Sequence, residues 1–192
     1  MTSKKANAQQ ILDSALRLAE VCGWERLHLF DIAADLGIGL DTIAVHYRDK
    51  DHLVEAWFDR ADRAMLARAG ASDMHALTAE KRLEELLIAW LDSLAEYRAL
   101  TAQMLLHKLE PGHLHQQALG LLRIGRTVQW WREAAQRESR YLCRAIEESL
   151  LTGVYLRSFI HWLRHPDEDP AECRALLRRQ LRRGPLAVLL NR

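Results

Sequence analysis

The chain has 192 residues, of which 49% are hydrophobic and 28% are charged, and its formal net charge at pH 7 is +1. This composition is typical of a globular protein and excludes a disordered or collagen-like chain. Nine glycines and four prolines are few for this length. Long stretches rich in Ala, Leu, Arg and Glu have none of the apolar–polar alternation that strands require, so we expect an all-α protein.

The sequence contains no run of about eighteen apolar residues, and the segment from Met1 to Lys5 leads into a polar stretch. We therefore expect neither a membrane span nor a signal peptide, which predicts a cytoplasmic protein. The three cysteines, Cys22, Cys143 and Cys173, are odd in number and far apart. Reduced, partly buried side chains are expected at these positions rather than a metal or redox site.

The first seventy residues show helical spacing of their apolar residues, interrupted by turn signals. Gly23 stands where a left-handed cap ends a helix, residues 37–39 form a tight turn, and Asp49 is placed to cap the helix that follows it. The pattern predicts four helices, over about 11–22, 29–36, 40–46 and 50–70. Small and polar residues at 69–73 then interrupt the periodicity and indicate a boundary. We predict an N-terminal domain at 1–70 and a C-terminal domain at 71–192.

The C-terminal domain is expected to consist of long helices and a short apolar tail. Asp169, Pro170 and Glu172 together indicate a helix start, since they supply a cap, a first-turn proline and a side chain that reaches back to the cap. The pattern predicts helices over about 78–94, 98–109, 113–131, 138–163 and 170–183. The tail at 186–190 either folds back on this domain or contacts a second subunit.

Six short motifs follow one another with the spacing of a known family: ILDSALRL at 11–18, GW at 23–24, DIA at 31–33, LGI at 36–38, TI at 42–43 and HYRDKDHL at 46–53. With these motifs, residues 8–60 resemble the TetR family of helix-turn-helix transcriptional regulators. The resemblance implies a three-helix DNA-binding unit whose third helix enters the major groove, and a fourth, connecting helix. It also implies a variable ligand-binding part that dimerises through its last two long helices.

Several positions that contact DNA in that family carry other residues here. His28 stands where a Ser or Thr caps the second helix, and Ala44 replaces a Tyr that binds phosphate. The turn usually offers Ser followed by Lys or Arg, but here it reads Gly39-Leu40-Asp41. Residues 1–60 hold seven basic and ten acidic side chains, a balance of −3, which weakens attraction to phosphates. The side chains left to contact operator DNA are Lys4, Lys5, Thr42, His46, Tyr47 and Lys50.

A second resemblance covers about 85 residues of the C-terminal part. It comprises RALTAQMLL at 98–106, Pro111, Leu114, WW at 130–131, YLCR at 141–144, WLRHPD at 162–167 and AECRALL at 171–177. In order and approximate spacing this stretch is similar to the coenzyme Q biosynthesis lipid-binding proteins. The resemblance implies a TetR-like fold that holds an isoprenoid lipid and does not bind DNA.

Aromatic and Met side chains of the C-terminal helices are candidates for the wall of an apolar pocket. We predict that the pocket is lined by Trp90, Met104, Trp130 and Tyr155, although an ordinary core position is the alternative for each one. The helices at 138–164 and 169–183 are expected to form a homodimer interface, with Phe159, Leu177 and Leu181 as its apolar contacts.

Catalytic and metal-binding patterns are weak. No nucleophile elbow, phosphate-binding loop or paired carboxylate is recognisable, so we expect no enzyme activity and no cofactor. His161 and His165 are four residues apart and share a helix face, and His107, His113 and His115 are close in sequence. Because no further ligand completes either group in the sequence, we expect no metal site.

Two functions follow from these observations. The first is a TetR-type regulator, expected to be a repressor, that binds operator DNA as a dimer and releases it when an apolar small molecule occupies the C-terminal part. The alternative is a TetR-fold protein that carries an isoprenoid lipid and has lost DNA binding, as in ubiquinone biosynthesis.

Overall fold

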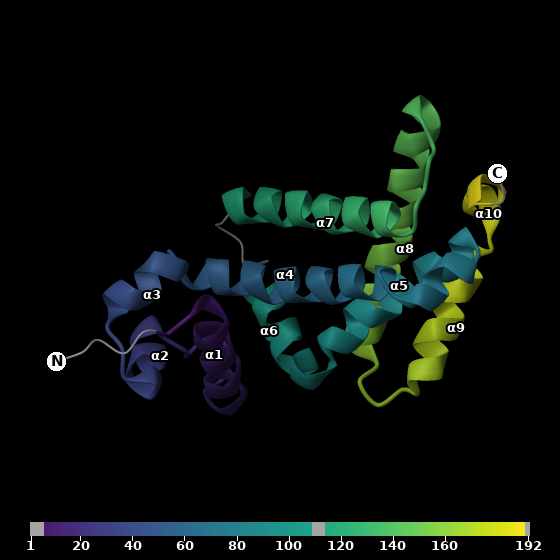
Figure 1. Cartoon of the computed structure of the whole chain (residues 1–192). Helices are drawn as coiled ribbons and strands as arrows, with labels where there is room; N and C mark the ends of the chain where they lie inside the picture. The colour runs from purple at the N-terminus through teal and green to yellow at the C-terminus, as the bar shows by residue number, and fades with distance from the viewer. Residues whose placement is uncertain (1–5, 109–113, 191–192) are drawn as a thin grey trace. The chain divides into compact units, whose positions relative to one another are not determined.

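The computed structural model of the chain describes residues 6–108 and 114–190, with side chains left undescribed at 107–121. Within these ranges every regular element is a helix and there is no strand, which confirms the predicted all-α class (Figure 1). The described helices contain none that is long and apolar enough to cross a membrane.

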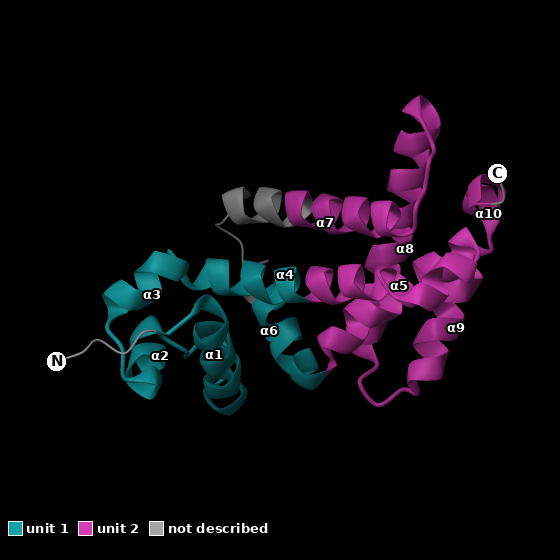
Figure 2. Ribbon diagram, in the orientation of Figure 1, with its two compact units in different colours: residues 1–60, 96–112 teal, residues 61–95, 113–192 magenta. Residues whose placement is uncertain are grey.

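The chain divides into two compact units (Figure 2). The head unit comprises residues 1–60 and 96–112, and the body unit comprises residues 61–95 and 113–192. The division falls inside a helix, α4 (Lys50–Ala69), rather than at the expected boundary after residue 70. The helix α6 (Arg98–Lys108), which the sequence places with the C-terminal part, belongs to the head unit.

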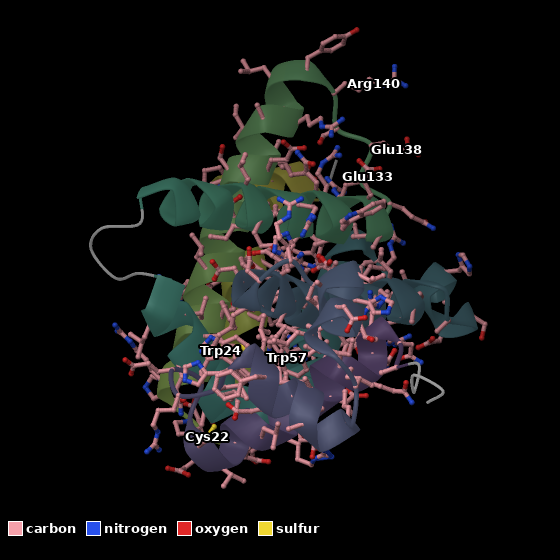
Figure 3. The ribbon with its side chains drawn as sticks, turned by 90° about the vertical axis from the view of Figure 1, so that its left-hand side faces the viewer. Cys22, Trp24, Trp57, Glu133, Glu138 and Arg140 are labelled. Carbon is pink, nitrogen blue, oxygen red and sulfur yellow. The ribbon has the colours of Figure 1, made fainter. Side chains whose placement is uncertain are left out.

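The head unit is built on three N-terminal helices: α1 (Ala8–Cys22), α2 (Leu29–Leu36) and α3 (Leu40–His46). Asn7 and Gln10 begin α1 by a reciprocal pair of hydrogen bonds, each 2.9 Å long, which satisfies two backbone donors of the first turn. Gly37 adopts the left-handed conformation, with a φ of +65°, at the turn between α2 and α3. Apolar side chains of these helices, of the segment after α1 and of α4 form the buried core of the head unit, with Ile11, Leu16, Trp24, Ile32, Ile43, Leu53 and Trp57. Figure 3 labels two of them, Trp24 and Trp57.

The body unit contains the remaining helices. They are α5 (Ala79–Ser93), α7 (Leu114–Ala134), α8 (Tyr141–Arg164), α9 (Pro170–Leu181) and α10 (Gly184–Leu190), with short 3-10 turns η1 (Ser72–Ala76) and η2 (Ala95–Tyr97) beside them in the chain. The predicted start of α9 is confirmed, since the Asp169 carboxylate accepts a 2.8 Å hydrogen bond from the Ala171 amide and Pro170 occupies the first turn.

The apolar tail forms the helix α10 and packs against α8 in the same chain. Its side chains Leu186 and Leu190 are buried. The guanidinium of Arg137 donates a 2.8 Å hydrogen bond to the Leu189 carbonyl and pairs with the fully buried carboxylate of Glu147. Of the two expected placements of the tail, the fold-back is therefore the one observed.

Candidate functional site

The outer face of α3 is the candidate nucleic-acid interface, because two buried anchors fix which residues point outward. Ile43 is 1% exposed, and Tyr47, directly after the helix, is 6% exposed. The Tyr47 hydroxyl donates a 2.7 Å hydrogen bond to the carbonyl of Ala8, the first residue of α1. The outward residues are then Leu40, Asp41, Ala44, Val45 and His46, all of them exposed.

The residues predicted to contact DNA are not equally accessible. His46 is exposed and Thr42 is half-buried, whereas Tyr47 is part of the core. Lys50 donates a 3.1 Å hydrogen bond to the Glu25 carbonyl, and its ammonium lies 5.1 Å from the centre of the Trp24 ring. Burial lowers the pKa of Lys50 from its ordinary value. Lys4 and Lys5 lie outside the described residues.

Most other cations of the head unit are engaged by groups of the same unit. Arg17 pairs with Asp35 at 2.6 Å, and Arg60 pairs with Asp13. The Arg26 guanidinium donates a 2.6 Å hydrogen bond to the Cys22 carbonyl. Arg48 differs, because it is exposed and, among the described residues, the structure gives its side chain no hydrogen bond or ion pair.

Arg48 was not among the residues predicted to contact DNA. It follows the buried Tyr47 and immediately precedes the segment that begins α4. Its position in the HYRDKDHL motif, between the predicted contact residues Tyr47 and Lys50, is the sequence feature that could have identified it. The structure therefore identifies Arg48 as the accessible cation beside the outer face of α3.

The N-terminus of α2 is shielded by its own residues. The Asp31 carboxylate accepts a 2.9 Å hydrogen bond from the His28 amide and places a negative charge in the first turn. That charge occupies the electrostatically favourable position for an anion at a helix N-terminus. The His28 ring stacks on the exposed Phe30 ring, with their centres 4.9 Å apart. This end of α2 is therefore less suited to a phosphate than an uncharged Ser or Thr cap would be.

The side chains predicted to line a pocket fall in different places. Trp90 and Tyr155 meet in the body unit, with ring centres 5.3 Å apart and planes nearly perpendicular. Met104 is fully buried but belongs to the head unit, and Trp130 is 47% exposed on α7. The structure thus brings together two of the four predicted residues, and it adds Phe159, whose ring centre lies 5.1 Å from that of Trp90.

A buried polar network lies beside this aromatic cluster. The Asp62 carboxylate accepts hydrogen bonds from the indole N–H of Trp90, from the Arg123 guanidinium and from the Thr127 hydroxyl, at 2.8, 2.8 and 3.0 Å. Asp62 and Arg123 are 6% and 8% exposed, so this is an ion pair inside the body unit. Burial, followed by the nearby Asp62 charge, raises the pKa of the Tyr155 hydroxyl and keeps it protonated.

The residues predicted for the dimer interface are interior residues of the body unit. Leu177 and Leu181 of α9 are fully buried and Phe159 of α8 is 6% exposed, and α9 packs against both α5 and α8 of the same chain. A surface groove of about 590 Å³ lies instead along the outer sides of α8 and α9. It is lined by Leu150, Gly153, Val154, Arg157, Leu176, Arg179, Gln180 and Arg183.

The two short helices α2 and α3, joined by a tight turn and resting on α1, define a helix-turn-helix protein with an additional helical unit. The chain is 44% identical to a TetR transcriptional regulator from Nitrosomonas europaea whose crystal structure is known, over 91% of this chain and 95% of that one, with a TM-score of 0.80. A tetR-family regulatory protein from Rhodococcus RHA1 shares the fold, at 22% identity and a TM-score of 0.50 over 93% and 97% of the two chains. No family model matches the sequence, and no curated protein does. The chain belongs to the TetR family of transcriptional regulators.

Proposed function

We propose that this protein is a dimeric, DNA-binding regulator whose hold on DNA is controlled by an apolar ligand of the body unit. The 44% identity to the Nitrosomonas regulator, which extends over both units, is the observation that carries the proposal. A shared fold alone would leave the function open, since one fold hosts several functions. Three regions of the structure support the proposal further: the outer face of α3, the groove along α8 and α9, and the aromatic cluster around Trp90.

DNA binding is assigned to the outer face of α3 and the residues that flank it. Arg48 supplies a phosphate contact, and Thr42 and His46 reach base edges or the backbone from α3. Further contacts are assigned to Lys4 and Lys5. Lys50 adds another if it exchanges its Glu25 carbonyl partner for a phosphate. Each neutralised phosphate releases about one counterion. The small number of cations at this surface therefore predicts that affinity depends only weakly on salt concentration.

Dimerisation is assigned to an exposed stripe of α8, with a second copy of this chain as the occupant. Ile146 and Ile160 are 44% and 45% exposed, and the spacing between the members of the stripe alternates between four and three residues. That spacing keeps side chains on one face of a helix that packs against another helix. The stripe consists of Ile146, Leu150, Gly153, Arg157 and Ile160, and the groove along α9 continues it.

Control by an apolar ligand is assigned to the region of Trp90, Tyr155 and Phe159. These rings supply apolar surface, while the adjacent Asp62 network supplies the few polar groups that orient a ligand. Asp62 lies on α4, and the same helix carries Trp57 in the core of the head unit. A ligand that displaces the Asp62 network therefore acts on the helix that the two units share, which is how binding in one unit can bias the other.

Selection from random DNA at about 50 mM salt, a condition that favours phosphate contacts, tests the DNA-binding part. An enriched, two-fold symmetric sequence is the expected result, since a symmetric dimer reads two half-sites one helical turn apart. Identification by mass spectrometry of small molecules that co-purify with the protein tests the ligand part. An apolar compound that quenches tryptophan fluorescence and lowers DNA affinity would support both.

The second candidate function is a lipid carrier without DNA binding. It is favoured by one observation, namely that the outer face of α3 presents Asp41 and an 81% exposed Val45 and no cation of its own. If selection returns no enriched sequence and an isoprenoid lipid co-purifies, the head unit serves only as a structural element. The lipid-carrier function would then replace the regulator.

A further inference from the structure

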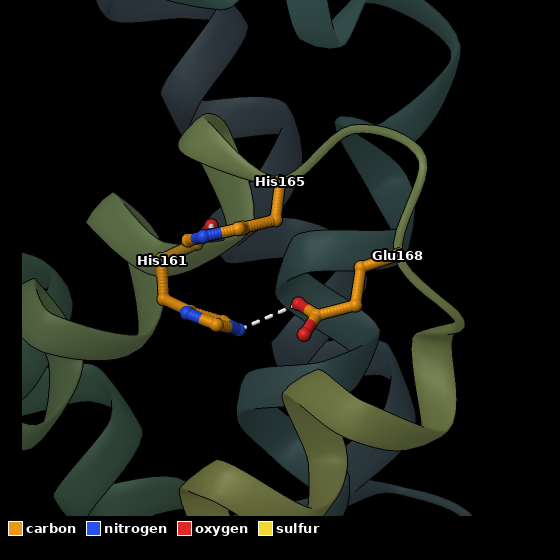
Figure 4. A group of neighbouring side chains, drawn as sticks. All are labelled: His161, His165 and Glu168. Atoms are coloured by element: carbon orange, nitrogen blue, oxygen red, sulfur yellow. Dashed lines mark hydrogen bonds and ion pairs between the residues drawn. The ribbon is translucent and has the colours of Figure 1, made fainter.

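Three side chains meet where α8 ends and α9 begins. His161 lies in the last turn of α8, His165 caps the end of that helix, and Glu168 returns to them from the connection to α9 (Figure 4). One ligand atom from each of the three lies within 4.8 Å of the others. The Nε2 atom of His161 and the Oε2 atom of Glu168 are 2.6 Å apart.

The contact between His161 and Glu168 has the distance of a hydrogen bond but leaves the nitrogen unsatisfied. The His161 Nε2 atom is buried, and among the described residues no hydrogen bond of acceptable geometry reaches it. A buried nitrogen without a hydrogen bond raises the free energy of the folded state. The same imidazole nitrogen is a good ligand for a cation that lies between it and a carboxylate. A cation bound between the two atoms would satisfy this nitrogen, once Nε2 and Oε2 move apart from 2.6 Å to the spacing of metal ligands.

His165 is oriented in the way that metal ligands usually are. Its Nδ1 atom lies 2.9 Å from the His161 carbonyl, and because a carbonyl only accepts, the neutral ring carries its proton there. The lone pair of the ring then lies on Nε2. A backbone carbonyl that holds the distal ring N–H is the common outer-shell partner of a metal-binding histidine.

We propose that His161, His165 and Glu168 form a binding site for a divalent transition metal ion of the zinc class. Two imidazoles and one carboxylate, with water completing the coordination, are a known ligand set for this ion. Metal–ligand bonds of about 2.0–2.2 Å in a tetrahedral arrangement separate ligand atoms by roughly 3.3 Å. The three ligand atoms already lie within 4.8 Å of one another, so only small movements separate them from that spacing.

The position of the site indicates what the metal does. Asp169 caps α9 one residue after Glu168, and α9 packs on α8. A metal ion held by His161, His165 and Glu168 ties the end of α8 to the start of α9. It would stabilise the helix pair to which dimerisation is assigned, but the metal site itself does not depend on DNA binding or on a ligand of the body unit.

The test uses the full chain, stripped of metal by a chelator and titrated with Zn²⁺ in competition with a chromophoric chelator. We expect one site whose affinity falls at least tenfold in His165→Ala and in Glu168→Gln, since loss of even an outer-shell partner costs 10–100-fold, roughly. His52→Ala is the matched control, because His52 also lies 2.8 Å from a carboxylate, that of Asp49, but belongs to no described three-residue group. The control should bind Zn²⁺ like the unaltered protein.

Co²⁺ provides a second readout. Visible absorption bands of tetrahedral intensity are expected for the unaltered protein and should be lost in His165→Ala. Far-UV circular dichroism of the same variants checks that the helices persist. Zn²⁺ that binds equally to the unaltered protein and both variants, for example through His107, His113 and His115, would overturn the proposal. The absence of Zn²⁺ binding at micromolar concentration would overturn it as well.

Discussion

The indole N–H of Trp57 donates a 2.9 Å hydrogen bond to the hydroxyl of Thr101, which joins α4 to α6 inside the head unit. Thr101 is fully buried, and its hydroxyl in turn donates to the Tyr97 carbonyl at 2.9 Å. A neighbouring residue of α6, Gln103, accepts a 2.8 Å hydrogen bond from the Trp24 amide. These bonds explain why α6 belongs with the N-terminal helices although the bonded residues are 44 and 79 positions apart in the sequence.

Replacing Thr101 by Val should therefore destabilise the head unit. The side-chain shape is kept, but the Trp57 N–H loses its acceptor in a buried position, which costs about 1–3 kcal/mol. Urea unfolding followed by Trp fluorescence measures the change in the free energy of unfolding. Thr101→Ser is the control, because it keeps the hydroxyl and removes one methyl group, worth about 0.8 kcal/mol. Equal losses in the two variants would show that packing, and not the hydrogen bond, holds α6.

The Glu84 carboxylate on α5 should make stability depend on pH in the acid range. Burial by itself would raise the pKa of Glu84, but hydrogen bonds from Arg178 and Lys81 outweigh it and lower the pKa from 4.5 to about 2. A depressed folded-state pKa stabilises the protein above the unfolded value of 4.5, and this contribution is lost as pH falls toward 2. Discounted for its partly exposed partners, the contribution is about 1–2 kcal/mol.

Glu84→Gln should remove that contribution at pH 7 and flatten the decline of stability between pH 5 and pH 2, roughly the range in which the carboxylate titrates. Denaturant unfolding at several pH values measures both effects. Glu80→Gln, which removes from the same helix the carboxylate that pairs with the exposed Arg182, serves as the control and should change little. An unchanged pH profile in Glu84→Gln would assign the acid sensitivity to other carboxylates.

The elements that the sequence predicts well are those governed by local chemistry. Gly23 ends α1 with a φ of +85°, Gly37 turns the chain between α2 and α3, and Asp169 with Pro170 begins α9. Each depends on a residue and its near neighbours, so periodicity and capping rules suffice. The start of α8 was placed three residues early, because Gln136 and then Tyr141 adopt positive φ values of 56° and 51°. Neither residue type indicates such a conformation.

Long-range pairing is what the sequence does not specify. Arg178 and Glu84 are 94 residues apart, and nothing near either one identifies its partner. Amphipathic spacing identified Leu177 and Leu181 as apolar but could not say whether they face this chain or a second copy. In the candidate site, Met104 lies in the head unit and Trp130 is 47% exposed on α7. The residue types alone do not specify these places, because the direction of a side chain depends on how whole helices pack.

The proposed dimer interface on α8 can be tested by comparing an exposed position with a buried one. Ile160→Asp adds a charge to a side chain that is 45% exposed on the α8 stripe, so it should dissociate the dimer while the body unit stays folded. Leu177→Asp buries a charge in the interior and should unfold the body unit. Light scattering reports the oligomeric state and thermal unfolding reports the fold. Val21→Asp, at an 86% exposed position of the head unit, should change neither. Intact dimers in Ile160→Asp would place the interface elsewhere.

The last prediction concerns charge beside α3, and it separates a working DNA-binding head unit from one that has lost this function. If Arg48 contacts a phosphate, Arg48→Glu should weaken binding for all sequences alike and reduce the slope of log affinity against log salt by about one for each subunit. Asp41→Lys, on the same exposed face, should strengthen binding and steepen that slope, because a repulsive charge becomes an attractive one. Fluorescence anisotropy with the selected DNA, titrated between about 50 and 200 mM salt, measures both quantities. Arg140→Glu, an exposed change before the start of α8, controls for the effect of net charge. If the Arg48 and Arg140 variants lose the same modest affinity and the Asp41 variant gains none, the outer face of α3 does not meet DNA, and the lipid-carrier function is the one to pursue.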